Sequence, residues 1–392
     1  MYKPILNIEE VKEQARDFKV NDVLKHHAYQ NKPLSFEDAY LLGVFTIYGY
    51  NPALEGTFKI NRDVAEKQSI AALCSLHNQA LYRQEGSAEQ IAGISAAVFD
   101  YDIFPSENSF LNPNVELCMD NCGMGGDLYR TPNVSTISAI IAASQGIPFC
   151  KHGSPGNTDS TGSSDFMKHC GVDLFSPKGV VEKGVEKFNY GYTDAVDTKY
   201  KLIHVQTHKS AQLAHMNDII GPITNPINPE IMTKRILGIN HLITTDKIAE
   251  AYQVLNEKGV TNLQKGLFVR GFIGKERNGG IDEVSIFPGG TIVSELNYGQ
   301  IGNYELYAED FGMKEIEYFQ VPKSKAKFSR SILEGKVQGA PRDLILANTA
   351  IIFYLQGRDL DEGVEIARNA IESGLPVRTI DDFAKHSCEN VK

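Results

Sequence analysis

The strongest constraint on the fold is a glycine-rich segment at residues 120–127, which reads DNCGMGGD. It follows a short apolar run, Val115–Met119, that predicts a strand, and it precedes a pattern over about 134–145 that predicts a helix. Glycines in such a turn let backbone NH groups approach an anion without obstruction by side chains. The segment therefore predicts an α/β fold with a candidate phosphate loop, although about half of isolated glycine turns of this kind are structural.

Strand-like and helical patterns alternate through the rest of the chain. The predicted strands are 147–150 and 266–269, and the predicted helices are 163–170, 245–259, 343–355 and 360–373. Gly357 and Gly374 stand where helix ends usually take a left-handed residue. We expect a central, mostly parallel sheet flanked by helices.

The first hundred residues differ from the rest of the chain, because they contain helical patterns and no strand patterns. Helices are predicted at 35–47, at 64–82 and from Ser87 onward, with Ser35 as the cap of the first and Gln90 completing a capping box at the third. A chain of 392 residues suits two domains. We expect a small helical-bundle domain at 1–110, completed by a segment near 210–240, and an α/β domain at 111–392.

Composition excludes several classes of protein. The net charge of −10 argues against general nucleic-acid binding, since affinity for a polyanion comes largely from Lys and Arg. The six cysteines lack C-x-x-C spacing, so neither a disulfide framework nor a zinc site is indicated. No signal peptide or membrane-spanning run is visible, and we expect a cytoplasmic protein.

Further polar loops follow the glycine segment. Asn133, Ser135 and Thr136 can cap the next helix or face a bound diphosphate and its metal. Lys151 follows a short strand, where it is either a phosphate-binding cation or a surface lysine. The loop 158–165, which contains Ser163, is either a helix cap or a third phosphate loop. Successive strand ends of this kind suit a ligand with two separated phosphate groups.

Two adjacent acids, Asp282 and Glu283, stand far downstream in a glycine-containing loop. Adjacent acids are usually solvated surface residues. In this position their oxygens also suit Mg²⁺, which commonly bridges carboxylates and substrate phosphates.

Together these segments resemble anthranilate phosphoribosyltransferase and its superfamily of glycosyltransferases and nucleoside phosphorylases, over most of residues 34–375. The matching motifs are the segment 120–127, Asn133-Val134-Ser135-Thr136, Lys151-His152-Gly153, Gly162-Ser163-Ser164-Asp165, the segment 221–226 (GPITNP), Asp282-Glu283, and Asn348 with Gly357. The resemblance implies a homodimer that uses Mg²⁺ to transfer a phosphoribosyl group from 5-phosphoribosyl 1-pyrophosphate (PRPP) to anthranilate, as in tryptophan biosynthesis.

The resemblance also implies roles for individual residues. PRPP would be bound by Gly123, Gly125, Gly126, Asp127, Asn133, Ser135, Thr136, Lys151, Gly153 and Ser163. The metal would be held by Ser135, Asp282 and Glu283, and the acceptor by His152, Ser154, His208, Lys209 and Pro222. No residue is assigned as a certain acid or base.

The acceptor positions depart from the family pattern. Ser154 replaces an asparagine, Leu128 replaces a glycine, and His208 beside Lys209 stands where the anthranilate-binding arginine is expected. An arginine forks onto a carboxylate with two hydrogen bonds, which histidine and lysine cannot reproduce. The acceptor could therefore be anthranilate or another aromatic compound.

Two other functions remain open at this point. A pyrimidine-nucleoside phosphorylase would use inorganic phosphate and no magnesium pair, which Asp282-Glu283 argues against. A nucleic-acid-binding relative of the family would need a basic groove, which the acidic composition does not indicate. Residues 1–33 and 52–59 are additions to the usual length, interpreted as surface elaboration or dimer contact.

Overall fold

The computed structural model describes residues 2–78, 81–105, 109–127, 129–156, 161–197, 201, 203, 213 and 215–389. The chain divides into a helical unit, Met1–Phe110 with Ala195–Pro229 and Leu242–Asn262, and an α/β unit, Leu111–Asp194 with Glu230–His241 and Leu263–Lys392. The segment near 210–240 that we expected to complete the helical domain is thus split between the units. We did not predict that residues 242–262 also belong to the helical unit.

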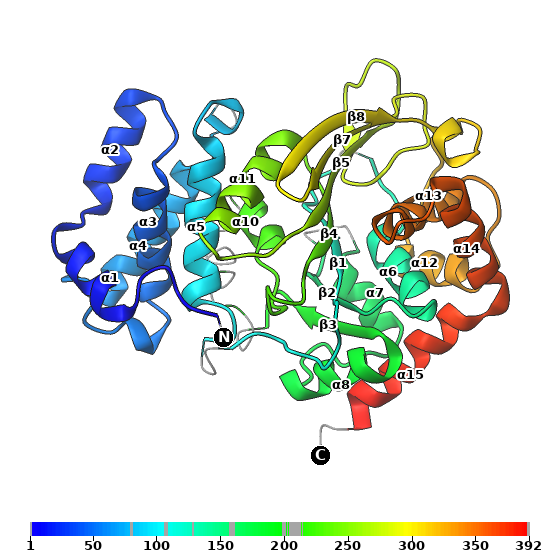
Figure 1. The fold of residues 1–392 in the computed structure, drawn as a ribbon, viewed down its shortest axis with the longest axis horizontal. Coiled ribbons are helices and arrows are strands. Elements are labelled where there is room, and N and C mark those ends of the chain that lie inside the picture. Colours follow the sequence, from blue (N-terminus) through cyan, green and yellow to red (C-terminus); the bar gives the residue numbers. More distant parts are fainter. Residues whose placement is uncertain are drawn as a thin grey trace. The chain divides into compact units, whose positions relative to one another are not determined.

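The helical unit is built around the closely packed helices α3 and α5 (Figure 1). Its described helices are α1 (Ile8–Gln14), α2 (Val20–Gln30), α3 (Phe36–Tyr48), α4 (Arg62–Ser75), α5 (Ser87–Tyr101), α10 (Asn217–Ile223) and α11 (Thr245–Glu257), with 3-10 turns at Ala15–Asp17, Pro52–Leu54 and Leu81–Arg83. A Cβ on Gly43 of α3 would lie 2.6 Å from Ala97 Cβ, and one on Gly93 of α5 would lie 2.4 Å from Phe36 O. Glycine at both positions therefore allows α3 and α5 to approach closely.

The predicted caps have different outcomes. Ser35 Oγ accepts a hydrogen bond from Asp38 N at 3.2 Å, which confirms the cap of α3. The capping box at Ser87 is wrong, because Gly86, with φ 88°, is the N-cap and makes no side-chain bond. Gln90 Oε1 instead accepts a hydrogen bond from Leu34 N at 2.8 Å, so a tertiary contact takes the place of the local one.

Asp100 ties the first residues of the chain to α5. Asp100 is buried, with 3% of the residue exposed. It accepts hydrogen bonds from Tyr2 Oη at 2.5 Å, Tyr40 Oη at 2.6 Å and Ile5 N at 2.9 Å. Burial raises the pKa of Asp100 to about 6, although these hydrogen bonds oppose the rise.

This burial predicts a pH-dependent contribution of Asp100 to stability. A folded-state pKa raised above the unfolded value stabilises the fold below the unfolded pKa, and this stability is lost as pH rises through about 6. The free energy of unfolding of the wild type, measured relative to that of Asp100→Asn, should fall by on the order of 3 kcal/mol between about pH 4 and about pH 7. Paired thermal melts across that range measure the difference. A difference that does not change with pH would contradict the prediction.

The α/β unit contains a mixed sheet of six strands in the order β1-β4-β5-β7-β8, with β6 paired to β5, and a separate parallel pair, β2 and β3. The strands are β1 (Asp120–Gly123), β2 (Phe149–Gly153), β3 (Tyr190–Asp194), β4 (Lys234–Gly238), β5 (Lys265–Phe272), β6 (Gly280–Ile281), β7 (Thr291–Asn297) and β8 (Gln300–Leu306). The pairs β1–β4 and β4–β5 are parallel, whereas β5–β7 and β7–β8 are antiparallel. A parallel bridge between Met119 and Phe149 joins β2 to the other side of β1.

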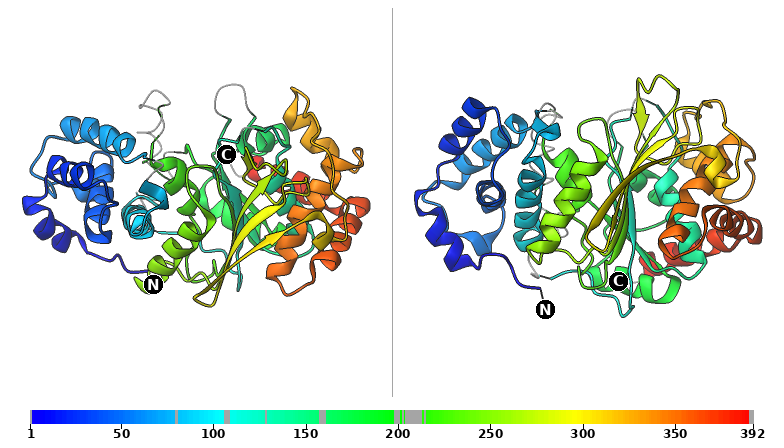
Figure 2. Two further views of the ribbon diagram at one scale, coloured as in Figure 1. Left: turned by 90° about the horizontal axis from the view of Figure 1, so that it is seen from above. Right: turned by 45° about the horizontal axis from the view of Figure 1, so that its top comes forward.

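Helices cover this sheet. They are α6 (Val134–Ser144), α7 (Ser163–His169), α8 (Lys178–Phe188), α12 (Lys325–Leu333), α13 (Ala340–Leu355), α14 (Leu360–Ser373) and α15 (Leu375–Glu389), with a 3-10 turn at Ala308–Phe311. Figures 1 and 2 show α6, α12, α13 and α14 on one side of β1, β4 and β5. Their apolar faces enclose one continuous hydrophobic core. This arrangement confirms the predicted α/β class with a helical N-terminal region and a sheet flanked by helices. The sheet is mixed and not mostly parallel as predicted, because β6, β7 and β8 pair in antiparallel fashion.

One local prediction in the α/β unit needs correction, and another is confirmed. The first strand lies at 120–123 and not at 115–119. Its polar residues Asp120 and Asn121 can be buried there because Arg235 pairs with the Asp120 carboxylate. Gly374 is left-handed as predicted, with φ 71°, but a further helix, α15, starts directly after it. Among the described residues, no helix has the length and apolar character needed to cross a membrane.

Candidate functional site

Glycines at the ends of neighbouring strands make room for the acidic segment 282–283. A Cβ on Gly123 at the end of β1 would lie 1.9 Å from Asp282 Oδ2, and one on Gly238 at the end of β4 would lie 1.6 Å from Asp282 O. A Cβ on Gly271 of β5 would lie 2.4 Å from Glu283 O. Since no side chain fits at these positions, the strand ends hold the acidic pair against the glycine loop.

Asp282 and Glu283 meet a third acid, Asp127. One ligand oxygen from each of the three carboxylates lies within 4.8 Å of the others. Asp282 Oδ2 accepts a hydrogen bond from Gly125 N at 2.6 Å, and Asp127 Oδ2 accepts one from Asp282 N at 3.2 Å. Burial and the neighbouring negative charges raise the pKa values of Asp127 and Glu283. The cluster is therefore electrostatically unfavourable by itself and suited to a cation.

The oxygens of this cluster fit a hard divalent ion. Thr131 Oγ1 donates a hydrogen bond to Glu283 Oε1 at 3.1 Å, but the buried Glu283 Oε2 accepts none from the described part of the chain. Lys325 of α12 is close enough for Glu283 and Asp282 to raise its pKa, although burial lowers that pKa overall. Carboxylate oxygens in this number are ligands of the kind that Mg²⁺ takes.

The glycine loop leaves its backbone accessible. Gly125 and Gly126 are exposed and have φ of 73° and 80°, and no other described group lies within 4 Å of where a Cβ would stand. A residue with a side chain would be strained in this left-handed conformation. The loop can therefore present NH groups to an anion, as its sequence predicts.

Hydrogen bonds connect the other predicted phosphate loops. Asn133 Nδ2 donates to Gly162 O at 3.0 Å, while Asp165 Oδ2 accepts from Gly162 N at 2.8 Å. Gly153 packs against the next loop, because a Cβ there would lie 1.9 Å from Ser163 Oγ. Thr136 Oγ1 is buried and has no hydrogen-bond partner among the described residues. Ser135 lies in the first turn of α6, where its carbonyl accepts a hydrogen bond from Asn121 Nδ2 at 2.9 Å.

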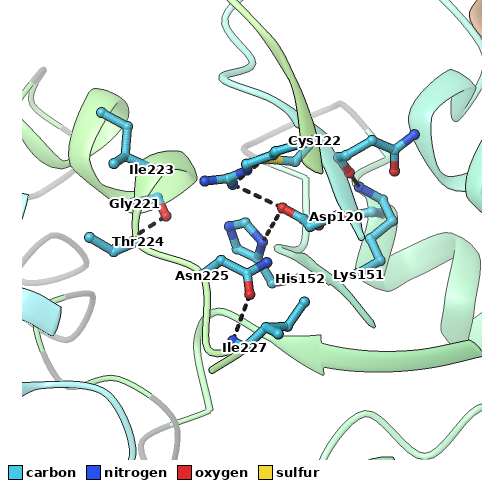
Figure 3. A network of polar contacts seen from close by, with 12 residues as sticks. Asp120, Cys122, Lys151, His152, Gly221, Ile223, Thr224, Asn225 and Ile227 are labelled. Carbon is cyan, nitrogen blue, oxygen red and sulfur yellow. Dashed lines mark hydrogen bonds and ion pairs between the residues drawn. The ribbon is translucent and has the colours of Figure 1, made fainter. Parts of the chain in front are cut away.

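Lys151 and His152 lie at the end of β2 and are buried (Figure 3). Lys151 Nζ donates to Asn121 O at 2.5 Å, so its charge lies beside β1 and not at the surface. His152 Nδ1 is 3.3 Å from Asp120 Oδ2, which also receives a hydrogen bond from Arg235 at 2.9 Å. Burial alone would raise the pKa of Asp120, but His152 and Arg235 lower it well below its usual range.

Asp120, Cys122 and His152 also lie within metal-ligand distance of one another. The Arg235 guanidinium lies 2.9 Å from Asp120 Oδ2 and 3.4 Å from Cys122 Sγ. A fixed positive charge at this position opposes a second cation. The cluster is therefore interpreted as a buried ionic network that positions His152.

The predicted acceptor residues do not all fall in one unit. Pro222 lies in α10 of the helical unit, next to Gly221 and Thr224, whose carbonyls accept hydrogen bonds from the buried Lys201 at 3.3 and 2.8 Å. Ser154 is exposed in the α/β unit. His208 and Lys209 lie outside the described residues.

Sequence reasoning missed several residues of the site. Asp127 was predicted only as a PRPP ligand, although it joins the carboxylate cluster, and Lys325, Thr131, Asp120 and Arg235 were not singled out. These side chains come from distant segments, so no local motif marks them. Their only signal in the sequence was the polar character of Asp120 and Arg235 within segments that form neighbouring strands.

The chain is similar to known proteins over most of its length. The sequence model of the glycosyl transferase family α/β domain matches residues 116–376. Anthranilate phosphoribosyltransferase of Haloarcula marismortui is 33% identical over 330 residues, which covers 82% of this chain and 91% of that protein. The enzyme of Pyrococcus furiosus is 29% identical over 361 residues, which covers 91% and 97%.

Solved structures share the fold. Anthranilate phosphoribosyltransferase of Thermus thermophilus superposes with a TM-score of 0.72 at 24% identity, over 93% of this chain and 99% of that one. The Saccharomyces cerevisiae enzyme in complex with PRPP and Mg superposes with a TM-score of 0.72 at 23% identity, over 94% and 98%.

Proposed function

Because the chain belongs to the anthranilate phosphoribosyltransferases of the glycosyl transferase family, we propose that it transfers the 5-phosphoribosyl group of PRPP to an aromatic amine and releases pyrophosphate. Anthranilate is the first candidate acceptor, which would place the enzyme in tryptophan biosynthesis. The observation that carries the proposal is the convergence of Asp127, Asp282 and Glu283 beside the exposed glycine loop.

Magnesium is the proposed cofactor. Asp282 and Glu283 would hold it, with Asp127 as a third carboxylate and Ser135 as a further oxygen. When bound, the ion supplies positive charge that stabilises the pyrophosphate leaving group. The buried Oε2 of Glu283, which has no hydrogen-bond partner among the described residues, supports this assignment.

The protein's own groups act on the rest of PRPP. The exposed glycine loop is proposed to bind pyrophosphate oxygens through the Gly126 NH, while the Gly125 NH donates to Asp282 Oδ2. Asn133, Thr136 and Ser163 are proposed to contribute from the adjoining loops. Negative charge grows on the pyrophosphate as its bond to the anomeric carbon breaks, so fixed NH dipoles stabilise the transition state more than the ground state. Lys151, held against Asn121 O, adds a positive charge next to these loops.

The acceptor amine needs little general-base help, because positioning against the activated anomeric carbon supplies much of the rate. His152, oriented by Asp120, is proposed to contact the acceptor together with Ser154. If anthranilate is the acceptor, His208 or Lys209 would hold its carboxylate. An unchanged KM for anthranilate in Lys209→Ala would count against that lysine.

Pyrophosphate release tests the proposal directly. The protein should release pyrophosphate from PRPP and Mg²⁺ in the presence of anthranilate or another member of a panel of aromatic acids and amines, and EDTA should abolish this release. No release with any acceptor would overturn the function and leave the fold. Activity that needs inorganic phosphate and survives EDTA would indicate nucleoside phosphorolysis instead.

The proposal includes a cytoplasmic homodimer, which the resemblance to the family implies. A mass of about twice 43.3 kDa by light scattering would support the dimer.

A further inference from the structure

A cavity of about 320 Å³ lies on the β4 and β5 side of the glycine loop. Its lining includes Gly126, Asn240, Arg270, Arg277 and Gly280. Lys151 lies on β2, which joins the other side of β1. The cavity and Lys151 therefore flank the glycine loop from opposite sides. Its volume is at the lower end of the range for small-ligand pockets, about 300–1,000 Å³.

Arg270 and Arg277 both line this cavity, and Glu305 balances the charge of Arg277. The guanidinium carbons of Arg270 and Arg277 lie 5.4 and 5.2 Å from the centre of the Phe272 ring. Arg277 is also fixed by Glu305, whose two carboxylate oxygens accept its hydrogen bonds at 2.8 and 2.7 Å. Arg270 donates to Asn240 O at 3.3 Å. Both cations are thus held on the buried Phe272 ring before any ligand arrives.

The rest of the lining also favours an anion. Asn240 and Asn278 contribute amides, and Gly279 and Gly280 place backbone without side chains at the wall. Asp127 is the only acid among the described lining residues, and it already belongs to the carboxylate cluster. Planar guanidinium groups match the oxygens of phosphate in pairs, which makes arginine the usual residue for such ligands.

We propose that this cavity is a second oxyanion site, which takes a small phosphate compound of the class of inorganic phosphate and pyrophosphate, with Arg270 as its main cation. The site does not depend on phosphoribosyl transfer. If the proposed function holds, pyrophosphate is also the product released on the other side of the same loop.

Calorimetric titration of the full chain in EDTA tests the site, with inorganic phosphate in one arm and pyrophosphate in the other. At least one of the two should bind. Arg270→Gln should weaken that binding by about tenfold or more, since a hydrogen bond to a charged group is lost. Arg358→Gln is the matched control, because Arg358 is exposed and pairs with Glu362 at 3.0 Å on α14. The arm with the tighter binding identifies the ligand.

Further variants separate this site from the proposed substrate site. Lys151→Met should leave binding in EDTA unchanged, and Arg270→Gln should leave the KM for PRPP within about threefold. If Arg270→Gln fails to fold by circular dichroism, Arg270→Lys keeps the charge but loses the planar fork, and it should weaken the same binding. The proposal is overturned if neither anion binds, if the arginine variants bind as wild type does, or if Lys151→Met abolishes binding. Failure of phosphoribosyl transfer would leave the EDTA titration unaffected.

Discussion

Glu283→Gln is expected to lower kcat/KM for phosphoribosyl transfer by about a hundredfold to a thousandfold, because the variant loses a charged ligand of the proposed Mg²⁺. The same change should stabilise the magnesium-free protein by on the order of 2 kcal/mol. Glu283 is held near Asp127 and Asp282, and one of its buried oxygens has no partner in the described part of the chain, so its charge is unfavourable until a cation arrives. Activity and stability should therefore change in opposite directions.

Thermal melts with and without Mg²⁺ distinguish this explanation from simple misfolding. Mg²⁺ should raise the Tm of wild type, since a ligand that binds only the folded state stabilises it, and should raise that of Glu283→Gln much less. Glu315→Gln makes the same chemical change at an exposed position and should behave as wild type. A Glu283→Gln protein with wild-type activity at low Mg²⁺ would remove Glu283 from the metal site.

Local motifs predicted the parts of the site that lie within single loops. The glycine segment, the Asn133 turn, the Lys151 loop and the Asp282-Glu283 pair all have nearby turn or cap signals, and the family resemblance they carry is confirmed. The expectation that distant loops converge was also correct for Gly125 and Asp282, which share a hydrogen bond. Parallel strands bring such loops to one edge of the sheet, so their meeting follows from topology.

Contacts between distant segments could not be predicted in the same way. Ser87 and Gln90 match a capping box, but Gln90 bonds to Leu34, which no local pattern reveals. Asp120 and Arg235 are register partners on β1 and β4, and their pairing is what permits a polar strand in the core. The apolar run before Asp120 therefore predicted the strand too early in the chain.

Gly238→Ala is the second change for which we expect a large effect, and it tests how the strand ends support the acidic pair. The added Cβ would lie 1.6 Å from Asp282 O and 2.5 Å from Asp282 C, which are backbone atoms and cannot turn aside. Either the segment at Asp282 moves or β4 separates from β5. We expect a loss of about 3 kcal/mol in stability and at least about a hundredfold in Mg²⁺-dependent kcat/KM.

Gly302→Ala on β8 supplies the matched control for this steric argument. No atom of the described residues lies within 4 Å of a Cβ at Gly302, so the same substitution should be neutral or slightly stabilising there. Thermal melts and pyrophosphate release on both variants make the comparison. If Gly238→Ala kept wild-type Mg²⁺ dependence, Asp282 would not need its position against β4, and the glycines at the strand ends would have no part in holding the metal ligands. The expected result instead makes those glycines as necessary to the site as the carboxylates, because the space they leave sets where the carboxylates stand.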